Sequence, residues 1–188
     1  LCLGVYLPGF FSMPAVDRDE ARFAQASRQM VESGDWVVPR IQDRARLNKP
    51  PLIYWLQASS AGLFTGGDIA RDRIWMYRVP SLIAAIVVVL LTRRIGLAMF
   101  HPRAAVLGAA FIAVAPVFLW EARQARADMV LVACTTGAML GLWLIVSRGA
   151  TTARQLLLWG CVALGVLVKG PVRPLVVVLG AVVFTLGT

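Results

Sequence analysis

The sequence is poor in charge and in the residues that build most soluble active sites. Charged residues make up 15% of the 188 residues, against about 25% in ordinary soluble domains. It has one histidine, His101, and three cysteines that lie far apart inside apolar runs, so we predict no Cys/His metal site. It also lacks a glycine-rich phosphate loop and a Gly-x-Ser-x-Gly motif. These absences argue against P-loop nucleotidases, serine hydrolases and zinc modules.

Long apolar runs dominate the chain instead. Apolar residues make up 59% of it and cluster into runs suited to a bilayer, which takes about 20 residues to cross. The predicted spans are residues 76–91, 104–120, 129–146 and 156–168, with a further span beginning near Pro174. Their connections are short, so neighbouring helices should run antiparallel. We therefore predict an all-α, polytopic transmembrane helix bundle.

The chain begins without Met and ends inside an apolar run, so we expect the N-terminal part of a longer protein. Residues 1–11 are interpreted as the end of a first transmembrane helix, 12–75 as a long polar loop and 76–188 as further transmembrane helices. The net charge is +9. We assign it to basic loops that meet anionic lipid head groups, and we predict no nucleic-acid partner.

The crossing count separates the charged connections into two groups. The 120–128 and 169–173 connections fall on the side of the long loop, together with Arg126, Asp128 and Lys169. Arginines 93, 94, 103, 148 and 154 fall on the opposite side. The positive-inside rule makes that opposite side cytoplasmic, so we predict that the long loop faces outward.

Two amphipathic helices are predicted within the long loop. Asp17 and Glu20 have the spacing of a capping box, and the 23, 26 and 30 positions then share one helical face. Ser33-Gly34 is a typical helix stop. A second helix is predicted from residue 52 to about 64, ended by the 66–68 segment. Both helices should lie at the membrane surface.

Several of these positions are candidates for chemistry, each with a structural alternative. Asp19 and Glu20 are adjacent carboxylates suited to general base work, but acids also favour helix N-termini for capping reasons alone. Lys49 precedes two prolines, which restrict its backbone and could direct its side chain at an anion such as phosphate. The alternative is that Lys49 is an ordinary exposed loop lysine. Asp128 and Lys169 are expected at the ends of membrane helices, where ionisable residues are functional candidates. The alternative for Asp128 is a structural pair with an arginine, and the alternative for Lys169 is a lysine that snorkels to the membrane surface.

These residues stand in segments that resemble a known family. The segments are 17–24 (DRDEARFA), 30–39 (MVESGDWVVP), 48–55 (NKPPLIYW), 78–81, 126–129 and 169–172. In this order they resemble the bacterial GT-C membrane glycosyltransferases, of the aminoarabinose transferase-like and protein O-mannosyltransferase-like kinds. The resemblance implies a GT-C fold in the bacterial inner membrane, with an outward-facing active site. It also implies an inverting transfer of a sugar from a polyprenyl phosphate, typically undecaprenyl phosphate, to a lipid A, glycan or protein acceptor.

The resemblance also implies roles for single residues. Asp19 resembles the family's motif carboxylate, the expected catalytic base, with Glu20 supporting it and Asp128 as a second acid. Lys49 resembles the lysine that holds the donor phosphate, and we group Arg126 and Lys169 with it as phosphate ligands. We predict no cofactor, while a divalent cation at the acids stays open as an alternative.

One departure from the family pattern bears on specificity. In the aminoarabinose transferases a glutamate precedes the lysine, whereas Asn48 stands there in this sequence. We therefore do not carry over the aminoarabinose specificity or an acid-dependent metal site at that position. Two other function classes stay open on the sequence: a transporter or flippase of lipid-linked substrates, and a non-catalytic membrane scaffold. A transporter is expected to show internal repeats and ionisable residues near mid-membrane.

Overall fold

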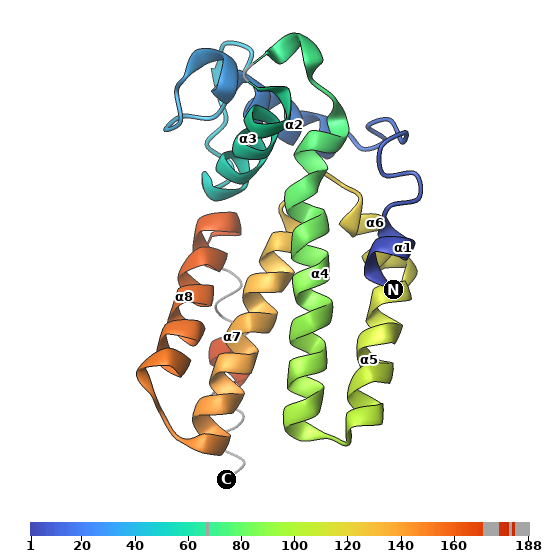
Figure 1. Cartoon of the computed structure of the whole chain (residues 1–188). Coiled ribbons are helices and arrows are strands. Elements are labelled where there is room, and N and C mark those ends of the chain that lie inside the picture. The colour runs from blue at the N-terminus through green and yellow to red at the C-terminus, as the bar shows by residue number, and fades with distance from the viewer. Residues whose placement is uncertain (67, 171–176, 181, 183–188) are drawn as a thin grey trace.

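The chain forms a bundle of long helices with a cap of shorter elements at one end (Figure 1). The structure is a computed structural model that describes residues 1–66, 68–170, 177–180 and 182. Its elements are α1 (Cys2–Tyr6), α2 (Arg18–Ser33), β1 (Arg40–Ile41), β2 (Arg44–Ala45), α3 (Leu52–Thr65), η1 (Ile69–Arg71), α4 (Ile74–Met99), α5 (Pro102–Val114), α6 (Pro116–Ala122), α7 (Asp128–Arg148) and α8 (Thr152–Lys169). The start of the span predicted near Pro174 lies outside the described residues.

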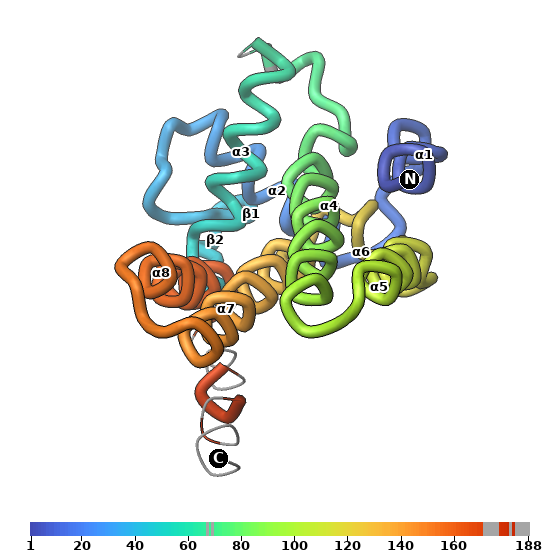
Figure 2. Tube along the Cα trace, turned by 60° about the horizontal axis from the view of Figure 1, so that its bottom comes forward, coloured from blue at the N-terminus to red at the C-terminus, as the bar shows by residue number. Residues whose placement is uncertain are grey.

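Among the described residues, α4, α7 and α8 are long and apolar enough to cross a membrane, and the bent pair α5–α6 makes a fourth candidate. In Figures 1 and 2 these helices run side by side, with α2 and α3 at one end. Many of their outward-facing leucines and valines are exposed, as expected of a surface that meets lipid. The predicted all-α transmembrane bundle is confirmed, with the small β1–β2 hairpin as an addition.

The first long helix extends beyond its predicted end. We expected residues 92–94 to end it, but α4 continues to Met99. Threonine and arginine are compatible with a helix interior, and the stretch contains no proline, while the single glycine, Gly96, is accommodated within the helix. The helix ends just before His101-Pro102, because a proline disfavours helical geometry in the residue before it.

The span predicted over residues 104–120 is broken, and the helix predicted over residues 1–11 is shorter than expected. Pro116 divides the segment into α5 and α6, which meet at 64°. A proline has no N–H to donate and its ring clashes with the preceding turn, which accounts for the break. The helix expected over residues 1–11 ends at Tyr6 instead. Pro8 follows, and Gly9 has a φ of 76°, which closes the helical path.

The two loop helices are confirmed as α2 and α3. Asp17 is the N-cap of α2 and accepts a hydrogen bond from the backbone N–H of Asp19 at 3.4 Å. Gly34 ends the helix in the left-handed conformation that favours glycine. The predicted second half of the capping box is wrong, because the Glu20 side chain turns into the protein interior instead of back to the N-cap.

The segment between α2 and α3 is fastened to both helices. The Asp35 carboxylate accepts hydrogen bonds from the backbone N–H groups of Val37 and Val38. These bonds hold the pKa of the Asp35 carboxyl below its usual value. Farther along, the Trp55 indole of α3 donates to the Trp36 carbonyl at 2.6 Å. The segment is therefore joined to α3 through Trp36 and to α2 through Gln42, whose N–H donates to the Gln29 side chain at 2.9 Å.

A proline inside α4 creates the attachment point for α3. Pro80 has no N–H, so the carbonyl of Met76, four residues earlier, loses its usual helical donor. The Ser60 hydroxyl of α3 donates to this carbonyl at 2.7 Å. An irregularity in the membrane helix is thus satisfied by the surface helix, which fixes where α3 docks.

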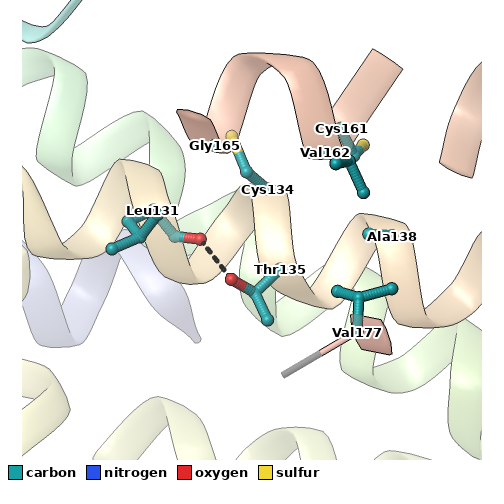
Figure 3. Close-up of a pocket in the computed structure, with 8 residues that line it drawn as sticks. All are labelled: Leu131, Cys134, Thr135, Ala138, Cys161, Val162, Gly165 and Val177. Atoms are coloured by element: carbon teal, nitrogen blue, oxygen red, sulfur yellow. Dashed lines mark hydrogen bonds between the residues drawn. The ribbon is translucent and has the colours of Figure 1, made fainter. Parts of the chain in front are cut away.

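Small residues let α7 and α8 approach closely. A Cβ added at Gly141 would lie 2.9 Å from the backbone nitrogen of Leu158, and one at Gly137 would lie 2.7 Å from the Cys161 sulfur. Figure 3 shows the same seam, with Cys134 of α7 near Cys161 and Gly165 of α8. Small residues at helix interfaces are a common packing device in membranes. This seam places the end of α8 beside the start of α7.

Candidate active site at the loop-facing end of the bundle

A buried ion pair fastens the loop to the first long membrane helix. Arg78 of α4 and Glu20 of α2 are both fully buried, with Nε 2.7 Å from Oε1 and Nη2 3.1 Å from Oε2. The backbone N–H of Ala125 also donates to Oε1 at 3.0 Å. The remaining guanidinium donors reach the carbonyls of Phe10, Met13 and Pro14. Glu20 therefore has no exposed surface with which to touch a substrate.

The connection between α6 and α7 is held from several sides. Arg123 donates to the carbonyls of Val5 and Tyr6 at 2.7 and 3.2 Å, which secures the end of α1. The Ser81 hydroxyl of α4 donates to the carbonyl of Arg126 at 3.2 Å. These bonds hold the backbone from which the Arg126 side chain extends against two other helices, α1 and α4.

Arg126 gathers carboxylates from two distant parts of the chain. Its Nη2 lies 3.4 Å from an Asp17 oxygen and 3.8 Å from an Asp19 oxygen, while Nη1 lies 3.4 Å from Glu121. The Asp19 side chain is 49% exposed, and its other oxygen lies 3.8 Å from Arg22. Asp19 thus lies near two arginines and remains half-exposed to solvent.

A second pair extends this group of charges. The Lys169 ammonium at the end of α8 forms an ion pair with Asp128 at the start of α7, and both side chains are less than one-third exposed. Asp128 and Lys169 also lie close enough to Glu121 to interact with it electrostatically. We call Asp17, Asp19, Glu121, Arg126, Asp128 and Lys169 the polar cluster. It joins residues from α2, α6, α7 and α8 at the loop-facing end of the bundle.

Lys49 lies outside the polar cluster, in the segment that leads into α3. It is half-buried, and within the described part of the chain it forms no ion pair or hydrogen bond. Two prolines separate it from α3, which contacts α8, the helix that ends at Lys169 (Figure 1). Nearby, Arg46 donates to the Tyr54 hydroxyl at 2.8 Å and stacks on the Phe23 ring. Burial raises the pKa of Tyr54, while the bond from Arg46 acts to lower it.

An apolar groove opens below α3. It encloses about 500 Å³ between α3, α4 and α7, and its walls include Leu63, Ile83 and Val130. Ser60 and Pro80, the residues of the α3–α4 attachment, also line it. The groove lies where a surface helix crosses the top of membrane helices, so an apolar chain could enter it from the bilayer.

The structure brings together four of the six predicted site residues. Asp19, Arg126, Asp128 and Lys169 belong to the polar cluster, whereas Glu20 is buried behind it and Lys49 is not in contact with it. Arg126 and Lys169, predicted as phosphate ligands, are already paired with carboxylates. Within the described residues, no three His, Cys, Asp or Glu side chains are placed to hold a metal ion.

Sequence reasoning missed two residues of the site. Glu121 follows directly after the predicted end of a span, and the rule that selected Asp128, an ionisable residue at a membrane helix mouth, would have found it. Arg78 lies inside a predicted span, and a lone arginine there should have indicated a buried partner.

Comparison with known proteins now decides the family. The sequence profile described as dolichyl-phosphate-mannose-protein mannosyltransferase matches residues 48–188. The chain belongs to this family. The match covers Lys49 and most of the polar cluster, while Asp17 and Asp19 lie before it. The resemblance drawn from the sequence motifs is thereby confirmed for the family as a whole.

The curated proteins that are similar to this chain include arabinosyl transferases. The chain is 29% identical over 136 residues to the undecaprenyl phosphate-alpha-4-amino-4-deoxy-L-arabinose arabinosyl transferase of Edwardsiella ictaluri, covering 72% of this chain and 23% of the relative. The enzyme of the same name from Pseudomonas paraeruginosa is 27% identical over 172 residues, covering 89% and 30%. The chain thus spans less than a third of these relatives.

The fold has a solved counterpart. The crystal structure of ArnT from Cupriavidus metallidurans bound to undecaprenyl phosphate matches with a TM-score of 0.87 and 24% identity, covering 98% of this chain and 34% of that one. The all-α membrane fold of the GT-C type is therefore confirmed for this chain. Together with its candidate spans, this makes it part of a multi-pass protein of the bacterial inner membrane.

Proposed function

We propose that the protein carrying this chain is an inverting glycosyltransferase that moves a sugar from a polyprenyl phosphate, such as undecaprenyl phosphate, to a hydroxyl of a lipid, glycan or protein acceptor. The reaction is proposed to take place on the periplasmic side of the inner membrane. Lipid A is one acceptor to test. Asn48 in place of a glutamate leads us to leave the sugar open.

The observation that carries this proposal is the polar cluster itself. Acids and cations from four helices lie together where the bundle meets its polar cap. Ionisable side chains that several helices bring together at one end of a membrane bundle are candidates for a polar reaction or a polar ligand. Family membership and undecaprenyl phosphate in the similar ArnT crystal structure support a lipid-linked sugar as that ligand.

Asp19 is the proposed base. An acceptor hydroxyl must lose its proton as its oxygen bonds to the anomeric carbon, and a carboxylate within hydrogen-bond reach can take that proton. Asp19 is half-exposed and lies 3.8 Å from both Arg22 and Arg126, so it is accessible and held near two cations. Glu20 acts indirectly. Its buried ion pair with Arg78 holds the start of α2 against α4, and the start of α2 carries Asp19. Glu20 is a positioning residue in this scheme.

Lys49 is the proposed ligand of the donor phosphate. As the new bond forms, the bond between the anomeric carbon and the phosphate oxygen breaks, and negative charge develops on the departing lipid phosphate. A nearby cation stabilises that charge, most strongly where water is excluded. Lys49 is half-buried and without an ionic partner among the described residues, whereas Arg126 and Lys169 are paired. We therefore assign Arg126 and Lys169 chiefly to orienting Asp19 and Asp128.

The apolar groove below α3 is the proposed path of the prenyl chain. Its walls are almost entirely apolar, and its volume of about 500 Å³ lies within the range of about 300–1,000 Å³ typical of ligand pockets. Lys49 stands just before α3, the helix that roofs the groove. A lipid phosphate at Lys49 could therefore extend its apolar tail along the underside of α3.

The proposed function is tested with the protein at its natural length, purified into nanodiscs and given an undecaprenyl-phosphate sugar with lipid A. We expect release of undecaprenyl phosphate together with a labelled glycosylated acceptor of inverted anomeric configuration. A lysine-to-phosphate contact contributes about 1.5–3 kcal/mol, so Lys49→Gln should lower kcat/KM by roughly 10- to 100-fold.

The matched control is Arg44→Gln, which removes an exposed cation from the same segment. It should leave transfer unchanged. If labelled donor crosses the bilayer without losing its sugar, the protein is a flippase and the proposal is wrong. If Lys49→Gln and Arg44→Gln transfer sugar at equal rates, the phosphate site lies elsewhere.

A further inference from the structure

A second groove opens at the end of the bundle opposite the polar cluster. It encloses about 640 Å³ between α4, α7 and the start of α8. Its walls are mainly leucines, including Leu90, Leu97 and Leu144, and two arginines complete it, Arg94 and Arg148. The reaction proposed above makes no use of this end of the molecule.

The charge at this end is of one sign. All ten aspartates and glutamates lie in residues 17–72 and 121–128, which belong to the loop-facing end. The far end carries five arginines at positions 93, 94, 103, 148 and 154, and no acidic residue of the sequence lies in the connections between these helices. Arg154 is engaged with the carbonyls of Arg148 and Gly149, at 2.7 and 2.6 Å.

Arg94 and Arg148 line the groove near the ends of α4 and α7. Arg148 is the last residue of α7, and Arg94 lies in the last two turns of α4. Both side chains belong to exposed residues, and neither forms an ion pair among the described residues. The apolar part of the groove continues from them toward the middle of the helices, through Leu90 and Leu144.

We propose that this groove binds an anionic phospholipid. Arg94 and Arg148 hold its phosphate, and one acyl chain lies along the leucines between α4 and α7. Guanidinium groups suit phosphate oxygens because they donate parallel hydrogen bonds and stay charged. Basic pockets between transmembrane helices are a recurrent lipid-binding arrangement. A volume of about 640 Å³ is ample for an acyl chain and falls within the usual ligand-pocket range.

The test uses native mass spectrometry on the protein at its natural length, delipidated and then titrated with phosphatidylglycerol or phosphatidylcholine. We expect selective retention of phosphatidylglycerol. Each arginine near an anionic head group contributes about fivefold in affinity, so Arg94→Gln with Arg148→Gln should weaken binding about 30-fold. The matched control, Arg93→Gln with Arg103→Gln, removes the same charge from the same end outside the groove and should change binding little.

A second arm tests the apolar half of the site. Leu144→Trp fills the groove with both arginines intact and should also abolish retention, whereas Leu107→Trp on the exposed face of α5 should not. Equal losses in the two arginine pairs would overturn the proposal, because they would indicate diffuse attraction to a basic surface. Equal binding of phosphatidylcholine would overturn it too. So would a photo-reactive residue at position 144 that cross-links to another segment of the protein instead of to lipid.

Discussion

Arg78 and Glu20 lie 58 positions apart in the sequence and form a fully buried, two-pronged ion pair, with Nε 2.7 Å from Oε1 and Nη2 3.1 Å from Oε2. The pair joins α4, a candidate membrane span, to α2, the surface helix that begins next to Asp19. The active-site geometry proposed here depends on this joint, because the polar cluster combines residues from the cap with residues from the bundle.

Loss of either partner should therefore destabilise the protein strongly. Removing one member of a buried pair leaves an uncompensated charge and costs about 3–5 kcal/mol. Glu20→Ala should lower the thermal unfolding midpoint measured in detergent by many degrees. The control is Asp68→Ala, which breaks an exposed pair with Arg71 and should cost less than about 1 kcal/mol. Similar unfolding midpoints for the two variants would show that the buried pair does not hold the cap.

The α3–α4 attachment predicts a coupling between Ser60 and Pro80. Ser60→Ala leaves the Met76 carbonyl without its donor, at a cost of about 1–3 kcal/mol in free energy of unfolding. In a Pro80→Ala background the helix regains its own N–H for that carbonyl, so the same change should cost much less. A double-mutant cycle of unfolding measurements gives the coupling directly. Additive effects would contradict the role assigned to Pro80.

The α7–α8 seam predicts a sharp difference between two glycines. Gly141→Ala places a Cβ 2.9 Å from the backbone of Leu158, so the helices must separate, and the cost should be about 1–3 kcal/mol. Gly160→Ala meets nothing within 4 Å and serves as the control. Because the seam sets Asp128 beside Lys169, Gly141→Ala should also reduce sugar transfer. Equal stability of the two variants would mean that the helices are not in close contact there.

The two kinds of cation proposed for the site should separate kinetically. Lys49→Gln removes a phosphate ligand and should chiefly raise KM for the lipid donor. Arg126→Gln releases Asp17, Asp19 and Glu121 from their shared partner, so it should chiefly lower kcat by disordering the base. Initial rates over a range of donor concentrations distinguish the two effects. A larger increase in KM for Arg126→Gln than for Lys49→Gln would assign the phosphate to Arg126.

Much of the fold could be predicted because its signals are local. Apolar runs marked α4, α7 and α8, and a cap residue and a glycine marked the two ends of α2. The errors came from prolines and from tertiary contacts. Pro116 breaks a run that is apolar throughout, and Glu20 has the spacing of a capping box but is drawn inward by Arg78. No local pattern reveals a partner 58 positions away.

The candidate site was predictable in outline through the crossing count, which placed Asp19, Arg126, Asp128 and Lys169 at one end of the bundle. That count cannot say which acid meets which cation. Arg126 was predicted to bind phosphate, but in the structure it is shared among carboxylates. Such pairings depend on side-chain geometry at a junction of four helices, and spacing along the chain does not encode it.

The central claim is that Asp19 is the base of a sugar transfer at the polar cluster. The most direct measurement is the transfer rate of Asp19→Asn beside Asp43→Asn, an exposed acid in the turn between β1 and β2, with the protein at its natural length. We predict that Asp19→Asn lowers kcat by about 10²- to 10⁴-fold, the usual contribution of general base catalysis, at an unchanged unfolding midpoint, while Asp43→Asn stays at the wild-type rate. Normal transfer by a folded Asp19→Asn variant would contradict the account.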